Sequence, residues 1–113
     1  MDPETIARLK HKIDNKPVVD KLSRTFNVLG DPTRVRIIFA LSEGEFCVNE
    51  LSQILGLTHS AVSHQLRALK DLDLVIFRKL GKQVYYSLND DHIKTLFSEG
   101  LNHVMEKIGT RVE

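Results

Sequence analysis

Two short amphipathic segments separated by Gly56-Leu57-Thr58 constrain the fold of this chain more than any other feature. Gly56 suits the left-handed position that ends a helix, and Thr58 suits the N-cap of the next one. The flanking segments, 48–55 and 59–72, have the lengths of the two helices in a helix-turn-helix motif. The pattern therefore predicts a helix-turn-helix over about 48–72.

Two segments rich in β-branched and aromatic residues follow this motif. Residues 74–78 and 83–88 favour strands, and the junction between them contains Gly81, which favours a tight turn. We expect a β-hairpin, or wing, over about 74–88. A helix-turn-helix followed by a hairpin predicts a winged helix-turn-helix, a mainly α fold with a small β-hairpin.

Helical periodicity extends to both sides of the winged motif. Apolar residues recur at three- and four-residue steps over 14–29. Asp31-Pro32 can open a further helix, and we expect its apolar residues to face a core: Val35, Ile37, Ile38, Ala40 and Leu41. Residues 90–108 carry a broad apolar stripe that predicts a long last helix. The 113 residues support a single domain over 1–113, and exposed stripes on the terminal helices would favour an oligomer.

The composition excludes several classes of protein. A single cysteine cannot form an internal disulfide, and we find neither a signal peptide nor an apolar run long enough to span a bilayer. We therefore expect a cytoplasmic protein without a membrane partner. We also find no Gly-rich phosphate loop and no carboxylate pair beside a plausible nucleophile. The sequence thus predicts neither an enzyme nor a small-molecule substrate.

The second helix of the motif has the side chains of a DNA-recognition helix. Val62, Leu66 and Leu69 can pack inward, which leaves polar residues on the other faces. The formal net charge is only +1, but residues 59–84 contain five basic residues and two acidic ones. This local excess predicts binding to double-stranded DNA through base edges and phosphates. The residues we expect to contact DNA are His59, Ser60, Ser63, His64, Gln65, Arg67, Lys70, Arg78, Lys79 and Lys82.

Four residues whose side chains can bind a metal lie on the last helix, in the pattern Asp90-x-His92 and His103-x-x-Glu106. Because a helix rises ~1.5 Å per residue, His92 and His103 share one face but stand about 16 Å apart along the axis. One ion cannot contact both in one chain. An antiparallel copy of the helix would place Asp90 and His92 beside His103 and Glu106 of the other chain, in two identical sites. Two imidazoles and two carboxylates suit tetrahedral zinc, and cobalt or nickel is less suited.

The same four residues also have an ordinary structural interpretation. Asp90 suits the N-cap of the last helix, and His92, His103 and Glu106 fall largely opposite its apolar stripe. They can therefore be a solvated surface. The alternative hypothesis is a metal-independent helix-turn-helix regulator or protein-docking module, which would bind no stoichiometric zinc.

Three stretches, LGDPTRVRI at 29–37, SAVSHQL at 60–66 and VYYSL at 84–88, resemble the ArsR/SmtB family of metal-responsive repressors. The resemblance covers nearly all of the chain after residue 14, and the pattern on the last helix is similar to the interhelical zinc site of the family's zinc sensors. It implies a homodimer through the N- and C-terminal helices that binds operator DNA without metal and is released by metal. It also implies that His103 donates its free ring N–H to a backbone carbonyl after the recognition helix, most nearly that of Asp73.

The family has a second, sulfur-rich metal site near the helix-turn-helix. Cys47 and Glu50 are its nearest counterparts here, with His11 as a third candidate ligand, but the N-terminal arm contains no cysteine. Cys47 and Glu50 also have the spacing of an N-terminal capping box, which is the interpretation we favour. A thiolate-rich cadmium or lead site and arsenic sensing are therefore not expected.

Overall fold

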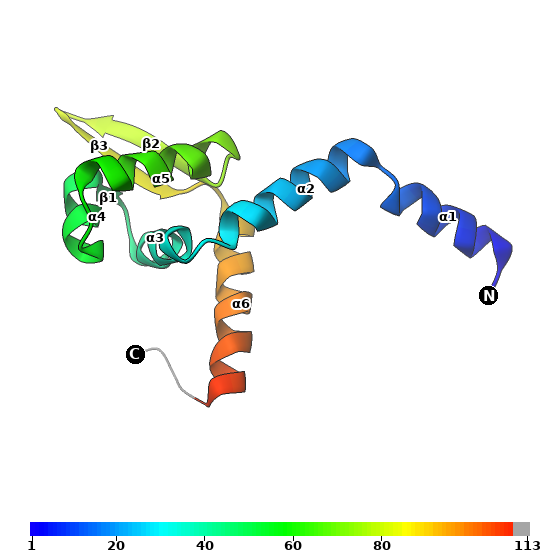
Figure 1. Ribbon diagram of the computed structural model, residues 1–113. Coiled ribbons are helices and arrows are strands. Elements are labelled where there is room, and N and C mark those ends of the chain that lie inside the picture. Colours follow the sequence, from blue (N-terminus) through cyan, green and yellow to red (C-terminus); the bar gives the residue numbers. More distant parts are fainter. Residues whose placement is uncertain (110–113) are drawn as a thin grey trace.

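Residues 1–109, which the computed structural model describes, form six helices and one antiparallel sheet. In chain order the elements are α1 (Pro3–Ile13), α2 (Lys16–Leu29), α3 (Pro32–Glu43), β1 (Phe46–Cys47), α4 (Val48–Leu55), α5 (His59–Asp71), β2 (Val75–Leu80), β3 (Gln83–Leu88) and α6 (Asp91–Ile108). Figure 1 shows α3, α4, α5 and the sheet gathered into one body, from which α1, α2 and α6 project. The winged helix-turn-helix architecture predicted from the sequence is confirmed.

The helix-turn-helix consists of α4 and α5. Gly56 ends α4 with a φ of 69°, a left-handed conformation that strains residues with a Cβ. The Thr58 hydroxyl accepts the Ala61 N–H at 3.1 Å and caps α5. The two local signals at this turn therefore act as the sequence predicted.

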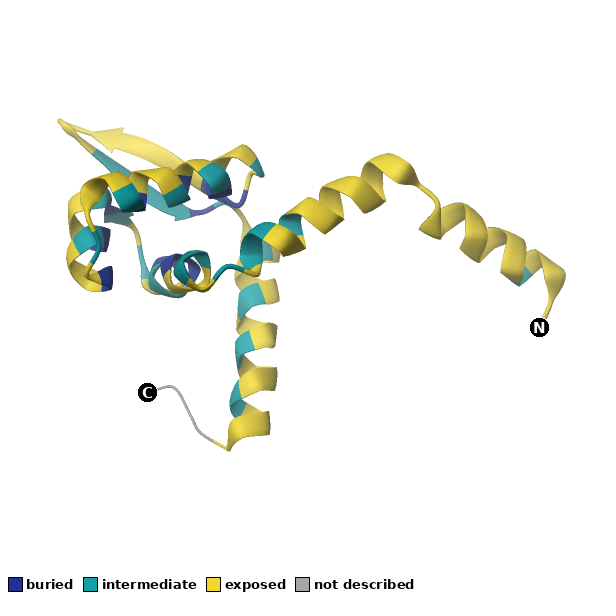
Figure 2. Ribbon diagram, in the orientation of Figure 1, coloured by how far each residue is buried: buried dark blue, intermediate teal, exposed yellow. Residues whose placement is uncertain are grey.

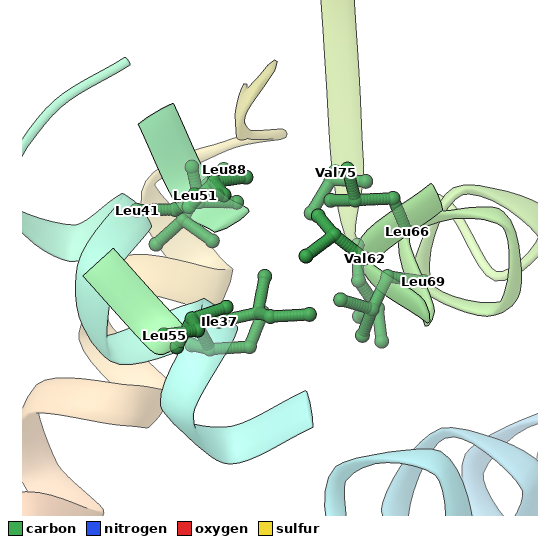
Figure 3. Packing of buried hydrophobic residues seen from close by; sticks show 11 residues of the cluster. Ile37, Leu41, Leu51, Leu55, Val62, Leu66, Leu69, Val75 and Leu88 are labelled. Atoms are coloured by element: carbon green, nitrogen blue, oxygen red, sulfur yellow. The ribbon is translucent and has the colours of Figure 1, made fainter. Parts of the chain in front are cut away.

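The hydrophobic core lies between α3, α4, α5 and the sheet (Figure 3). Val62, Leu66 and Leu69 form the inward side of α5, and each is at most 1% exposed. The other buried members are Ile37, Ile38, Leu41, Leu51, Leu55, Leu74, Val75 and Leu88. Because this packing fixes the inward face of α5, the opposite face of the helix is turned outward.

The wing is the antiparallel pair β2 and β3, with Val75 opposite Leu88 at its base and Gly81 at its tip. A third strand was not predicted: β1 pairs with β3, with Phe46 opposite Tyr86, so the strand order is β1-β3-β2. Two residues are too few to produce the alternation that identifies a strand in a sequence. The sheet therefore has one more strand than the predicted hairpin.

The N-terminal region contains one helix more than the sequence predicted. The helix expected over 14–29 begins at Lys16, where the Asn15 side chain caps it by accepting the Val18 N–H at 3.4 Å. Before it lies α1, in a segment for which no helix is predicted from the sequence. The Asp2 side chain caps α1 by accepting the Glu4 N–H at 3.3 Å, and Pro3 stands at the first position of this helix.

The three projecting helices, α1, α2 and α6, bury no residue completely in a single chain (Figure 2). Their exposed apolar side chains are Ile6, Leu9, Ile13, Val18, Val19, Leu22, Phe26, Leu96, Val104 and Ile108. Val35 of α3, which we expected in the core, is 39% exposed and lines an apolar groove with residues of α2 and α6. This groove measures about 350 Å³. No helix within residues 1–109 has the length and apolar character needed to cross a membrane.

Candidate nucleic-acid interface and metal half-sites

The outward face of α5 carries most of the predicted DNA contacts. Six of the predicted side chains are exposed on this helix: His59, Ser60, Ser63, His64, Arg67 and Lys70. The first four lie in the N-terminal half of the helix, which is the part that reads base edges when a recognition helix enters the major groove. The hydroxyl, imidazole and guanidinium groups on this face can donate hydrogen bonds to bases and phosphates.

Gln65 differs from the other predicted DNA contacts on α5, because it is half-buried and hydrogen-bonded to another part of the protein. Its Oε1 accepts a hydrogen bond from Nε of Arg34 at 2.8 Å. Arg34 belongs to α3, and its Nη1 also lies 3.5 Å from the Val28 carbonyl at the end of α2. Arg34 therefore orients Gln65 and leaves the amide N–H groups of Gln65 to meet an acceptor. No sequence pattern indicates this role of Arg34.

Two other α5 side chains contact neighbouring elements. His59 Nε2 lies 3.1 Å from Asn49 Oδ1 on α4, so the two helices of the motif are also joined by a polar contact. Lys70 Nζ lies 4.4 Å from the centre of the Phe77 ring on β2, a cation–π distance. Lys70 is therefore held between the end of the recognition helix and the wing.

The tip of the wing presents Lys79 and Lys82, both exposed, on either side of Gly81. Arg78, the third basic residue predicted to bind DNA from the wing, forms a bidentate ion pair with Glu45. Nε of Arg78 donates to Oε2 at 3.0 Å, and Nη2 donates to Oε1 at 2.9 Å. These hydrogen bonds lower the pKa of Glu45 and raise the pKa of Arg78. Glu45 thus occupies Nε and one N–H of Nη2, two of the donors with which Arg78 could bind a phosphate.

The exchange of Glu45 for glutamine tests this competition. In Glu45→Gln the guanidinium of Arg78 loses its anionic partner, so we expect DNA to bind about two- to fivefold more tightly. The salt dependence of the binding constant should become steeper by about one phosphate contact. The measurement is fluorescence anisotropy with duplex DNA over a range of salt concentrations. Glu43→Gln makes the same charge change at the exposed end of α3. Equal effects of both substitutions would show that net charge alone is responsible.

Asp90 and His92 form one half of the predicted metal site. His92 Nδ1 lies 3.6 Å from Asp90 Oδ1, and the His92 side chain is 96% exposed. Asp90 also caps α6, because its Oδ1 accepts the Ile93 N–H at 3.1 Å. The capping interpretation and the ligand interpretation are therefore compatible: capping uses Oδ1, and Oδ2 accepts no hydrogen bond within the described residues.

His103 and Glu106 lie three residues apart further along α6, and both are exposed. Within residues 1–109 of one chain, no three His, Cys, Asp or Glu side chains come together as a metal site. α6 runs as a single uninterrupted helix between the two pairs (Figure 1). One chain thus carries two separated candidate half-sites, each with an imidazole and a carboxylate, and two such halves would together offer the four ligands of a tetrahedral zinc site.

Of the three residues considered for a second metal site, Cys47 and Glu50 lie together, whereas His11 is far from both in one chain. Cys47 is buried, and its N–H donates to Oε1 of Glu50 at 3.0 Å, one of the two bonds of a capping box. His11 lies on α1, at the opposite end of the molecule from β1 and α4 (Figure 1). The local geometry is that of the capping interpretation.

Comparison with known proteins identifies relatives of this chain. Residues 31–76 match the family described as bacterial regulatory protein, arsR family. The chain is 36% identical to the transcriptional repressor SmtB homolog of Synechocystis sp., over 91% of this chain and 78% of that protein. It is 38% identical to the cadmium resistance transcriptional regulatory protein CadC homolog of Staphylococcus aureus, over 91% of this chain and 85% of that protein.

A similar fold is found in the homodimeric winged helix-turn-helix DNA-binding domain of a possible ArsR-family transcriptional regulator from Mycobacterium bovis, determined by NMR in solution. The TM-score is 0.79 at 27% identity, and the match covers 84% of this chain and 89% of that domain. The similarity therefore extends beyond the helix-turn-helix to most of the chain.

Proposed function

The chain belongs to the arsR family of bacterial regulatory proteins and is a DNA-binding regulator rather than an enzyme, and on this premise we propose that it is a zinc-responsive transcriptional repressor. The observation that carries the proposal is the pair of half-sites on α6, Asp90 with His92 and His103 with Glu106. In the metal-free state a homodimer binds operator DNA, and zinc weakens that binding.

The dimer follows from the apolar faces that a single chain exposes. Phe26 on α2 and Val104 on α6 are more than half exposed, and both line the groove between α2, α3 and α6. Exposed apolar surface of this extent favours association, and the related domain from Mycobacterium bovis is homodimeric. A two-fold axis near the middle of α6 would set the first half-site of one chain beside the second half-site of the other.

The DNA-binding surface of the dimer consists of two α5 helices and two wings. The exposed Ser60, Ser63 and His64 suit contacts with base edges, and Arg67 suits a backbone phosphate. Lys79 and Lys82 at each wing tip suit phosphates on the flanks of the site. A two-fold dimer of this kind favours a pseudo-palindromic operator with half-sites in successive major grooves.

Regulation follows from thermodynamic linkage between the two sites. Asp90 and His92 of one chain and His103 and Glu106 of the other would hold a zinc ion, which would connect the two α6 helices. The α6 helix packs on α3 through Phe97, whose ring centroid lies 5.5 Å from that of Phe39, so a change at α6 reaches the body that holds α5. Linkage requires that operator DNA weaken zinc binding by the same factor by which zinc weakens operator binding.

Imidazole nitrogen and carboxylate oxygen suit several divalent metals, so the choice of zinc depends on geometry. Four protein ligands from two half-sites match a closed tetrahedral site, whereas six-coordinate nickel would need further ligands. The relatives are named for different functions: one is a homolog of the repressor SmtB, and another is a cadmium resistance regulator. Cobalt, which also accepts tetrahedral sites, is the practical spectroscopic substitute.

Operator binding in the presence and absence of zinc tests the proposal. A binding site is first selected from random duplexes with chelator present, and its affinity is then measured by fluorescence anisotropy. We expect zinc to weaken binding by about 5- to 150-fold, the usual range of coupling of ~1–3 kcal/mol. Magnesium at the same ionic strength is the control. Equal binding with zinc and with chelator would support a metal-independent regulator instead.

A further inference from the structure

The turn that follows the recognition helix adopts a conformation that is costly for the residue it contains. Asp73 has a φ of 59°, the only positive φ of a residue other than glycine among residues 1–109. Its N–H donates to the Lys70 carbonyl at 2.9 Å, and the Leu74 N–H donates to the Leu69 carbonyl at 3.0 Å. These two bonds form a Schellman motif, in which glycine usually takes the place of Asp73. The turn is therefore tied to the last carbonyls of α5.

Asn89 fastens the same turn to the start of α6. Its Nδ2 donates to the Asp73 carbonyl at 2.7 Å. Its backbone N–H donates to the Leu74 carbonyl at 3.1 Å. Asn89 immediately precedes Asp90, the N-cap of α6 and first residue of the metal half-site. Two hydrogen bonds thus join the residue beside a proposed metal ligand to the turn that ends the recognition helix.

A third element meets this turn from the other side. Lys21 Nζ of α2 lies 3.8 Å from Asp73 Oδ2, in a pair whose side chains are 60% and 74% exposed. Such an exposed pair contributes little by itself, so the connection through Asn89 is the firmer one. Leu74, next to Asp73, is 2% exposed and belongs to the core, which prevents the turn from moving independently of α5.

We propose that Asn89 is a positioning residue that transmits the arrangement of the α6 helices to the recognition helix. The path is short and made almost entirely of backbone: Asp90, Asn89, the Asp73 carbonyl, and the final turn of α5. It contains no long flexible side chain, so a rotation of the first turn of α6 displaces the end of α5. The link lies within one chain and exists before any metal binds. The regulatory part of the inference rests on the proposed zinc response.

The test is Asn89→Ala, with Asn102→Ala as the matched control. Asn102 is exposed on α6 and adjoins His103 as Asn89 adjoins Asp90, but it forms no side-chain hydrogen bond within the described residues. In metal-free Asn89→Ala we expect operator affinity to fall about three- to tenfold and the Leu74 amide to exchange with solvent faster by a similar factor. Asn102→Ala should leave both unchanged.

The zinc measurements complete the test. Zinc affinity of Asn89→Ala without DNA should stay within about threefold of wild type, whereas the zinc-induced loss of operator affinity should shrink at least about threefold. An undiminished zinc effect, or faster exchange spread uniformly over all core amides, overturns the positioning role. If wild type itself ignores zinc, the proposed function fails. The metal-free affinity and the Leu74 exchange then decide the role of Asn89 alone, and unchanged values overturn it.

Discussion

Mixing His92→Ala and His103→Ala proteins is expected to restore tight zinc binding that neither variant has alone. In either homodimer every site has lost one imidazole ligand, so we expect zinc affinity to fall at least about 100-fold. Loss of a residue that only hydrogen-bonds to a ligand costs less than this. In the mixed dimer one site lacks both histidines, and the other keeps Asp90 and His92 from one chain with His103 and Glu106 from its partner. One intact site per mixed dimer results.

The measurement is zinc titration against a competing chelator after the subunits have exchanged. Random exchange makes mixed dimers about half of the population, so about one tight zinc per two dimers is expected. Asp90→Ala mixed with His92→Ala is the control, because both substitutions fall in the same half-site and no mixed dimer contains an intact site. Failure to restore binding in the first mixture, or restoration in both, would contradict a site shared between chains.

The same two mixtures distinguish a metal site shared between chains from an ordinary solvated surface on α6. His92 is 96% exposed, and the two half-sites do not meet within residues 1–109 of one chain. The remaining histidine of one variant can therefore raise zinc affinity together with that of the other variant only if the two α6 helices meet. Subunit complementation is therefore a consequence of the antiparallel arrangement itself. A metal-independent regulator would show no difference between the two mixtures.

The parts of the fold that could be predicted are those set by neighbouring residues. Gly56 and Thr58 define the turn of the helix-turn-helix through their own backbone and cap preferences, and both act as predicted. Asp90 and His92 are two residues apart, and their contact also follows from local geometry. β1 was missed because two residues carry no periodicity, and it becomes a strand only by pairing with β3.

The parts that could not be predicted depend on contacts between distant residues. Arg34 and Gln65 are 31 residues apart, and Arg78 and Glu45 are 33 apart. Nothing in the sequence indicates that Gln65, a predicted DNA contact, accepts a hydrogen bond from Arg34. Nor does it indicate that Arg78, another predicted contact, is paired with the Glu45 carboxylate. The burial of Val35 was overestimated for a related reason. Helical periodicity identifies an apolar face, but it does not distinguish a core from a groove open to a second chain.

Phe26→Glu is expected to yield a folded monomer that has lost operator binding. Phe26 is 55% exposed on α2 and lines the apolar groove, so a carboxylate there would be buried without a partner if the dimer formed. The core of α3, α4, α5 and the sheet does not contain Phe26 and should remain intact. Because two linked recognition helices bind DNA with a high effective concentration, we expect operator affinity to fall at least about 100-fold.

Sedimentation, circular dichroism and anisotropy measure the three parts of this prediction. Ser23→Glu is the control, because it adds the same charge to an exposed position of α2 outside the groove lining. It should remain dimeric and bind operator within about threefold of wild type. Tight zinc binding should also disappear in Phe26→Glu, although all four ligand residues are intact, since each site requires two chains. A dimeric Phe26→Glu protein with normal operator affinity would show that the groove between α2, α3 and α6 is not the interface.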